Sequence, residues 1–339
     1  MLMKKLPKSY NKTALIYMGG IFFLIASALT GIMLGSSLIT SSEIWQIITG
    51  NSENSAAFRI LFYVRLPRTL ACIVCGAALS VSGAVIQSVL NNRLASPSII
   101  GVNSGAGLAV TLAMACGIYS GLKVSLLAFL GAFTVSLLVS VTARKWGASR
   151  STVILMGVAL NSLLNALSDS ITTFDSNIGV MSNDFRIGEF SAVTYQKLLP
   201  AAAITVIALV ILSSLTNELE ILTLGQDTAH SLGMNVFAMR TVFLLLASLL
   251  AGCAVSVAGL LSFVGLVVPH IVRRISGGKI SHLLPLCIIY GGAFVTLCDT
   301  LARTLFSPYE VPVGIIMAFI GAPFFVFILI RGKGGHRHA

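Results

Sequence analysis

Charged residues are scarce in this sequence. They make up 10% of its 339 residues, and only 11 residues are acidic. In an ordinary soluble chain about 25% of the residues are charged, and a soluble domain of this length needs far more polar surface to cover its core. Apolar residues make up 56% of the chain, in long runs that approach the ~20 residues needed to cross a hydrocarbon core as a helix. The scarcity of charge therefore excludes a soluble globular protein and predicts an all-α, polytopic membrane protein.

Signatures of several enzyme classes are also missing. No GxxxxGK[ST] phosphate-binding loop occurs, because Gly278-Lys279 is followed by Ile280 and lacks the upstream glycine. Neither an HExxH zinc motif nor a GxSxG nucleophile motif with outlying partners is present. The sequence therefore indicates a protein that is not an enzyme. Any energy derived from a nucleotide has to come from another chain.

The cysteines show no metal-ligand spacing. All of them fall inside or at the ends of apolar runs, and the CxxC formed by two of them lies on one apolar helix, so buried small residues are the favoured interpretation. His270 follows Pro269, and a residue that satisfies the backbone beside a helix-breaking proline is favoured there over a haem ligand. No metal site and no cofactor are predicted. The six cysteines are Cys72, Cys75, Cys116, Cys253, Cys287 and Cys298.

Charge and turn residues divide the apolar runs into about ten spans within one membrane domain, 1–339. The first is too long for the core of a signal peptide. The eighth is short, and Pro269 interrupts it, which is tolerated only where protein or a cavity covers the freed backbone. The expected spans are approximately 14–37, 66–90, 98–118, 122–144, 151–173, 198–216, 241–260, 263–275, 283–301 and 311–331.

The distribution of lysine and arginine predicts the orientation. Ten spans place both chain ends on one side, and segments that carry an excess of Lys and Arg face the cytoplasm. With both termini in the cytoplasm, the internal segments hold most of the 22 basic residues. This bias explains the net charge of +11 without a nucleic-acid partner. It predicts a multi-pass protein of a bacterial cytoplasmic membrane.

Two spans carry a similar pattern of small residues. GAALSVSG occupies 76–83, and GCAVSVAG occupies 252–259. Small residues at these spacings let helix backbones approach closely in lipid. Two interpretations stay open: chance similarity between two Gly- and Ala-rich helices, or an inverted-topology repeat whose halves begin at spans two and seven.

Several longer blocks occur in a characteristic order. Over about residues 60–331, they resemble the FecCD-like permease family, whose members belong to ABC importers for ferric siderophores, haem and vitamin B12. The resemblance implies a type II ABC importer permease with ten spans that works as a dimer. The blocks are RLPR (65–68), GAALSVSGAVIQ (76–87), NRLASPSIIGVNSG (92–105), SFVGLVVPHIVR (262–273), DTLARTLFSPYEVPVGI (299–315) and IGAPFFVFIL (320–329).

The resemblance implies import of an iron chelate into the cytoplasm, with a ferric siderophore favoured and haem or cobalamin possible. It implies three protein partners besides the lipid bilayer: an ABC ATPase dimer, an extracytoplasmic substrate-binding protein and a second permease chain, identical or paralogous. The alternative is a stand-alone secondary transporter or channel. That class usually places coupling carboxylates or unwound, ion-binding helices at mid-membrane, whereas most of the 11 acidic residues lie near span ends or in loops.

The longest internal polar segment, 217–240, contains LTLGQDTAHSLGMN at 222–235. Its apolar spacing predicts a short amphipathic helix with a glycine at each end. The resemblance implies that this is the coupling helix that sits in a cleft of the ATPase, and a solvated loop helix is the alternative. The residues that match the coupling block of the family are Leu224, Gly225, Gln226, Asp227, Ala229, Leu232 and Gly233.

Three arginines lie at the outer ends of spans two and nine, against the positive-inside trend. They are Arg65, Arg68 and Arg303. The resemblance implies that they pair with glutamates on the substrate-binding protein, which would steer encounter and fix register. The alternatives are snorkelling to lipid headgroups and pairing with Asp299 or Glu310.

The resemblance also places a cytoplasmic gate at the turn between spans two and three, with Asn92 and Leu94 at the constriction. Ser151 and Thr152 resemble a second gate element more weakly. Arg93 stands where the family usually has proline, which would stiffen the turn, so an inside-positive anchor stays open here. Asp169 in span five either faces the transport pathway or caps the outer end of its helix.

Overall fold

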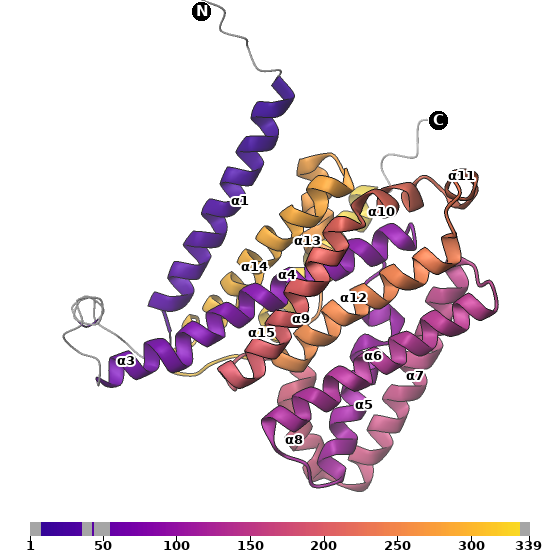
Figure 1. Cartoon of the computed structure of the whole chain (residues 1–339). Coiled ribbons are helices and arrows are strands. Elements are labelled where there is room, and N and C mark those ends of the chain that lie inside the picture. The colour runs from indigo at the N-terminus through magenta and orange to yellow at the C-terminus, as the bar shows by residue number, and fades with distance from the viewer. Residues whose placement is uncertain (1–7, 36–42, 44–54, 333–339) are drawn as a thin grey trace, which may run out of the picture.

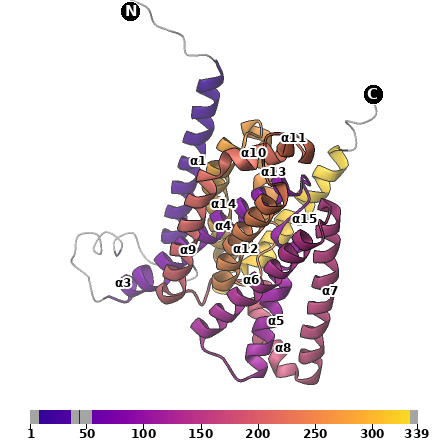
Figure 2. The ribbon, with the colours of Figure 1, turned by 45° about the vertical axis from the view of Figure 1, so that its right-hand side comes forward.

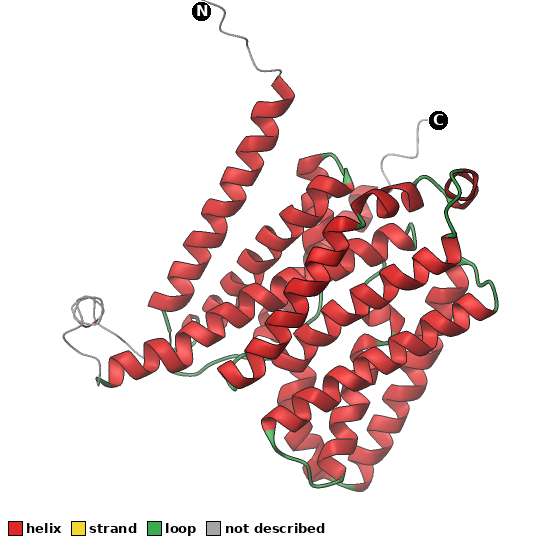
Figure 3. Cartoon of the chain, in the orientation of Figure 1, coloured by secondary structure: helices red, strands yellow, loops and turns green. Residues whose placement is uncertain are grey.

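The computed structural model describes residues 8–35, 43 and 55–332, and the regular elements in this part of the chain are all helical (Figure 3). The predicted all-α fold is confirmed. Seven helical segments are long and apolar enough to cross a membrane. They are Thr13–Met33 in α1 (Lys8–Met33), Ala56–Val89 ending in α4 (Leu66–Val89), α6 (Gly121–Lys145), α7 (Arg150–Phe174), α9 (Tyr195–Ser214), α12 (Val236–Ala258) and α14 (Ile280–Thr304).

The other three predicted spans also form helices. They are α5 (Val102–Ala115), α13 (Val264–Ser276) and α15 (Val313–Gly332). Each predicted span therefore coincides with a helix, but α5 and α13 are shorter than a crossing requires. Backbone carbonyls and amides outside a helix cannot be left facing lipid, so the chain around these two helices has to be covered by the rest of the bundle.

Helix α4 lies at the centre of the bundle, and most of its residues are buried between α12, α13 and α14 (Figure 1). Small residues make this close packing possible. A Cβ at Gly83 would overlap the carbonyl of Gly265 on α13, and a Cβ at Gly76 would overlap the carbonyl of Gly291 on α14. In lipid, where the hydrophobic effect does not drive helices together, close backbone contact at small residues such as glycine stabilises their association.

The two spans with the shared small-residue pattern, α4 and α12, pack against each other and run in opposite directions (Figure 1). Each is followed by one of the two short helices: α4 by the single turn η2 (Pro97–Ile100) and α5, and α12 by α13. In an inverted repeat, the corresponding helices of the two halves run in opposite directions and are followed by corresponding helices, as α4 and α12 are here.

Five further elements lie between the predicted spans. The second span begins ten residues earlier than expected, with α3 (Ala56–Ile60) and the π-helical turn η1 (Leu61–Arg65) continuous with α4. Helix α8 (Ser176–Ile187) follows α7. The segment 217–240 holds α10 (Thr216–Thr223) and α11 (Gln226–Ser231), and it runs into the first turn of α12. These helices are short or amphipathic, so hydropathy alone does not distinguish them from loops.

The bundle has two distinct ends. The start of α1, the end of α15 and the α10–α11 segment lie at one end, named here the α11 end (Figure 2). Helices α3 and α8 lie at the opposite end, named the α8 end. Helix α1 stands at the edge of the bundle and packs mainly against α14.

Candidate functional site

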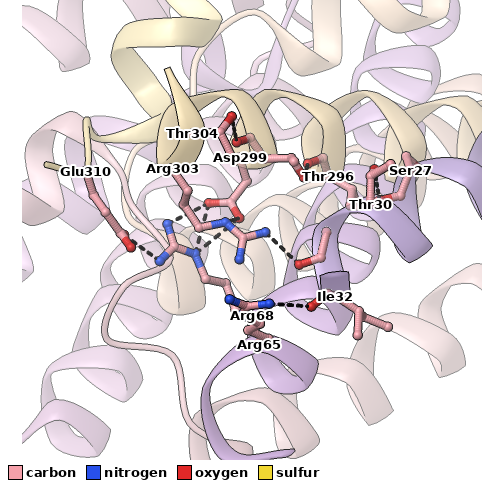
Figure 4. A network of polar contacts seen from close by, with 12 residues as sticks. Ser27, Thr30, Ile32, Arg65, Arg68, Thr296, Asp299, Arg303, Thr304 and Glu310 are labelled. Carbon is pink, nitrogen blue, oxygen red and sulfur yellow. Dashed lines mark hydrogen bonds and ion pairs between the residues drawn. The ribbon is translucent and has the colours of Figure 1, made fainter. Parts of the chain in front are cut away.

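The three outward arginines meet in one cluster at the α8 end (Figure 4). Arg68 Nε donates to both carboxylate oxygens of Asp299 at 3.1 Å, and its Nη2 donates to Oδ1 at 3.0 Å. Arg68 Nη1 donates to Glu310 Oε2 at 2.7 Å. Arg303 Nε lies 3.1 Å from Asp299 Oδ2. Asp299 is fully buried, so two guanidinium groups share one carboxylate that water does not reach.

The same cluster holds the end of α1. Arg65 Nη1 donates to the carbonyls of Ile32 at 3.1 Å and Met33 at 2.6 Å, and Arg303 Nη2 donates to the carbonyl of Gly31 at 2.9 Å. The last carbonyls of a helix have no partner within it, and cations are favourable at that end. The arginines therefore cap α1 and fasten it to the rest of the bundle.

The sequence left open whether these arginines dock a partner or pair within the chain. The structure shows internal pairing for Arg68 and Arg303, and their residues are 6% and 2% exposed. Arg65 is 3% exposed. None of the three presents a free guanidinium in this conformation, so a docking role stays a prediction that needs the cluster to open.

A second candidate site is the α10–α11 segment. Gly225 and Gly233 bound α11 with φ of 119° and 81°, values that glycine adopts without strain. The predicted short helix is therefore present, but only six residues long. Ala229 faces inward with no exposure, whereas Leu224 and Leu232 are 61% and 62% exposed. Two large apolar side chains thus project from a short helix at the α11 end.

This segment is tied to the spans beneath it. Arg240 on α12 donates to the carbonyl of Ala148 at 3.1 Å and to the Gln226 side chain at 3.5 Å. Arg150 at the start of α7 donates to the carbonyl of Leu222 at 3.3 Å. The α10–α11 segment is therefore held by arginines of two spans: Arg150 of α7 bonds α10, and Arg240 of α12 bonds α11 through Gln226.

The predicted gate residues lie at two separate helix ends. Asn92 and Leu94 follow α4 in a tight turn in which Asn92 Oδ1 accepts the amide of Leu94 at 2.9 Å, and Leu94 is exposed. Ser151 and Thr152 are exposed in the first turn of α7. Arg93, between the first two, is also exposed.

The sequence did not single out the polar cavity beside α7. This cavity, of about 330 Å³, is lined mainly by amide and hydroxyl side chains, and at one side by Arg186. Arg186 on α8 is paired with Asp169 on α7 at 3.1 Å. Asp169 therefore pairs with a neighbouring helix, and Asp175 rather than Asp169 follows the end of α7. Scattered asparagines in apolar runs were the only sequence signal for this cavity.

The cysteines are placed mostly as expected. Five cysteines are buried, but Cys116 is exposed, because it lies just beyond the end of α5. The prediction of a buried residue is wrong for Cys116. The ring of His270 packs edge-on against Phe324, with the ring centres 6.5 Å apart.

Comparison with known proteins places these features in a family context. A family model described as the FecCD transport family matches residues 23–331. The hemin transport system permease protein HmuU of Yersinia pestis is 32% identical over 92% of this chain and 94% of its own length. The Fe(3+)-citrate import system permease protein YfmD of Bacillus subtilis (strain 168) is 34% identical over 88% of each chain. A solved metal-chelate-type ABC transporter in an inward-facing conformation superposes with a TM-score of 0.82 at 29% identity, covering 94% of this chain and 99% of the other.

Proposed function

The chain belongs to the FecCD transport family, and we propose that it is the permease subunit of an ABC importer that carries a ferric chelate into the cytoplasm. A separate ATPase dimer supplies the energy, a substrate-binding protein delivers the cargo, and a second permease chain completes the pathway. Relatives named for hemin and for Fe(3+)-citrate support an iron complex as cargo. A ferric siderophore is the favoured member of that class.

The observation that carries this proposal is the exposed, anchored helix α11. Exposed Leu224 and Leu232 offer an apolar contact outside the predicted spans, where such residues mark a protein partner. The arginine contacts to α7 and α12 would convert movement of that partner into movement of spans. A transporter that works alone needs no such element. The α11 end is then cytoplasmic, with both termini on that side.

The exposed face of α7 supports a pathway between two permease chains. Ser162, Asn165 and Asp169 are exposed on a helix that is long and apolar enough to cross the membrane. Polar side chains at membrane depth are unfavourable against lipid and normally face protein or water. This face would therefore line the cargo pathway opposite the same face of a second copy or a sister chain. Asn92, Leu94, Ser151 and Thr152 would close it at the cytoplasmic end.

Docking of the binding protein can proceed by exchange of partners in the arginine cluster. The side chain of Glu310 is 32% exposed, whereas that of Asp299 is 1% exposed. A glutamate of the binding protein would thus compete with Glu310 for Arg68 and leave the Asp299 pairs intact. Such an exchange would fix the register of the complex more than it adds affinity.

Affinity purification with the co-expressed ATPase tests the proposal. We expect the double variant Leu224→Glu, Leu232→Glu not to co-purify with the ATPase, because two apolar side chains that would be buried against the ATPase become charged. Leu305→Glu is the matched control, since Leu305 is similarly exposed but lies at the α8 end, and this variant should keep the ATPase. The proposal is overturned if the purified chain by itself transports a ferric chelate across liposome membranes.

A further inference from the structure

Two helices in this bundle are too short to cross a membrane. Helix α5 has 14 residues and α13 has 13, which at about 1.5 Å per residue gives roughly 20 Å of a hydrocarbon core about 30 Å thick. Each short helix follows one of the two spans that share the small-residue pattern, α4 and α12. Interrupted helices in corresponding positions of two halves are where transporters build substrate sites.

The chain leading into each short helix departs from α-helical geometry, and side chains of neighbouring helices hydrogen-bond to backbone carbonyl oxygens there. Asn161, near the middle of α7, donates to the carbonyls of Ser98 at 2.8 Å and Ile99 at 3.4 Å. Before α13, the backbone of Phe263 adopts a left-handed φ of 65°, and in the first turn of α13 the carbonyl of Gly265 accepts a hydrogen bond from Gln87 on α4 at 3.1 Å. Unwound backbone at membrane depth persists only where protein covers it or a cavity adjoins it.

A cavity lies where the two unwound segments meet. Its volume is about 210 Å³, and Ser98 in η2 and Asn103 at the start of α5 line it together with Ser262 before α13 and Leu266 in the first turn of α13. The larger cavity beside α7 shares Ser98 and Asn103 with it. The two cavities therefore adjoin at these two residues, and the larger one extends along the face of α7 that carries Asn161 and Asn165. This pair of cavities is named here the waist.

The waist offers hydrogen bonds but no free charge. Ser104 and Ser168 in its wall already donate to groups of the chain. Asn103 and Asn165 line the larger cavity, and neither amide has a hydrogen-bond partner within the described residues. The charge of Arg186 is balanced by Asp169 at 3.1 Å. A ligand in the waist thus meets unused amides in an electrically neutral wall.

We propose that the waist is a cargo subsite in which Asn103 and Asn165 bind the oxygen shell of an uncharged ferric chelate, of the ferric trihydroxamate class. The proposal rests on the proposed function and narrows its substrate. A strongly anionic chelate would be buried without a counter-charge, which is unfavourable. A porphyrin presents an apolar face, which would leave the two amides without hydrogen-bond partners and so lower the affinity.

Uptake by the complete importer in liposomes, with its ATPase and binding protein, tests the subsite. The probe is ferrichrome, an uncharged ferric trihydroxamate. We expect Asn103→Leu with Asn165→Leu to lower the initial rate of ferrichrome uptake about ten- to thirty-fold, since each lost hydrogen bond contributes about 1 kcal/mol. ATP hydrolysis should stay within about twofold. Asn103→Ser with Asn165→Ser replaces the amides by hydroxyl groups, which can still donate hydrogen bonds, and should recover part of the rate.

The matched control is Ser170→Ala, on the same exposed helix but outside the cavity lining, and it should leave uptake unchanged. Undiminished uptake by the double leucine variant overturns the subsite, as does a loss of ATP hydrolysis that parallels the loss of uptake. A preference of the unsubstituted importer for ferric enterobactin, a strongly anionic chelate, or for haem overturns the uncharged class. If the unsubstituted importer takes up none of these three chelates and no ferric citrate, the proposed function itself fails.

Discussion

Asp299 holds the arginine cluster together, and its removal should be the most destabilising single change at the α8 end. Its buried carboxylate accepts three hydrogen bonds from Arg68 at 3.0–3.1 Å and pairs with Arg303 at 3.1 Å. Removing one partner of a buried ion pair leaves an uncompensated charge, which is destabilising by about 3–5 kcal/mol. Asp299→Ala strands two guanidinium groups, so we expect a loss in that range. Glu310 offsets part of it, because it remains beside Arg68.

Graded variants separate charge from shape. Asp299→Asn keeps the volume and one acceptor oxygen but loses the charge, so a loss of about 1.5–3 kcal/mol is expected. Glu310→Gln alters a pair that water partly reaches, so about 1 kcal/mol or less is expected. A variant with leucine at Arg68, Asp299 and Arg303 removes the buried ion pairs of Asp299, and it should recover most of the stability, because apolar replacements of buried ion networks are often neutral.

Denaturant unfolding of the purified permease measures these differences. A thiol-reactive dye is a suitable probe once the exposed Cys116 is replaced by serine, because Cys72 and Cys75 are fully buried and become reactive only on unfolding. The expected order of stability loss is Asp299→Ala, then Asp299→Asn, then Glu310→Gln. A free energy of unfolding for Asp299→Ala within about 0.5 kcal/mol of the unsubstituted chain would refute the claim that this cluster stabilises the bundle.

Three further changes test other contacts. Gly83→Ala should lower the unfolding temperature sharply in the same dye assay, because its Cβ overlaps the carbonyl of Gly265, whereas Gly19→Ala, in open space on α1, should not. Gly233→Ala forces a side chain into a φ of 81° at about 1–2 kcal/mol, and it should weaken ATPase binding in pull-down more than Gly179→Ala does. Arg65→Leu releases the last carbonyls of α1, so limited proteolysis should cleave the α1 connection faster while the remaining bundle stays protected.

Much of the membrane architecture follows from contiguous stretches of sequence. The apolar runs predicted a helix at each of ten places, from α1 to α15, because the free energy of transfer into lipid is a property of neighbouring residues along the chain. Glycines at both ends of the segment 226–231 likewise predicted α11, since a positive φ is a local demand. Helix α8 was missed because it is not apolar enough to stand out from a loop, and α3 was missed because Arg59 and Arg65 interrupt the apolar run that leads into α4.

Other features depend on residues that are distant in sequence. The sequence offered Asp299 and Glu310 as candidate partners of Arg68, but it could not show that Arg68 pairs with both of them, across 231 and 242 positions. It also could not show that Asn161 satisfies the unwound chain at Ser98, or that Asn103 and Asn165 border one cavity. Each of these pairings exists only after helices have packed, because a buried polar group takes whichever partner the fold brings within hydrogen-bonding distance. Local hydropathy thus determined where the chain crosses the membrane, and helix packing decided which polar groups meet inside it.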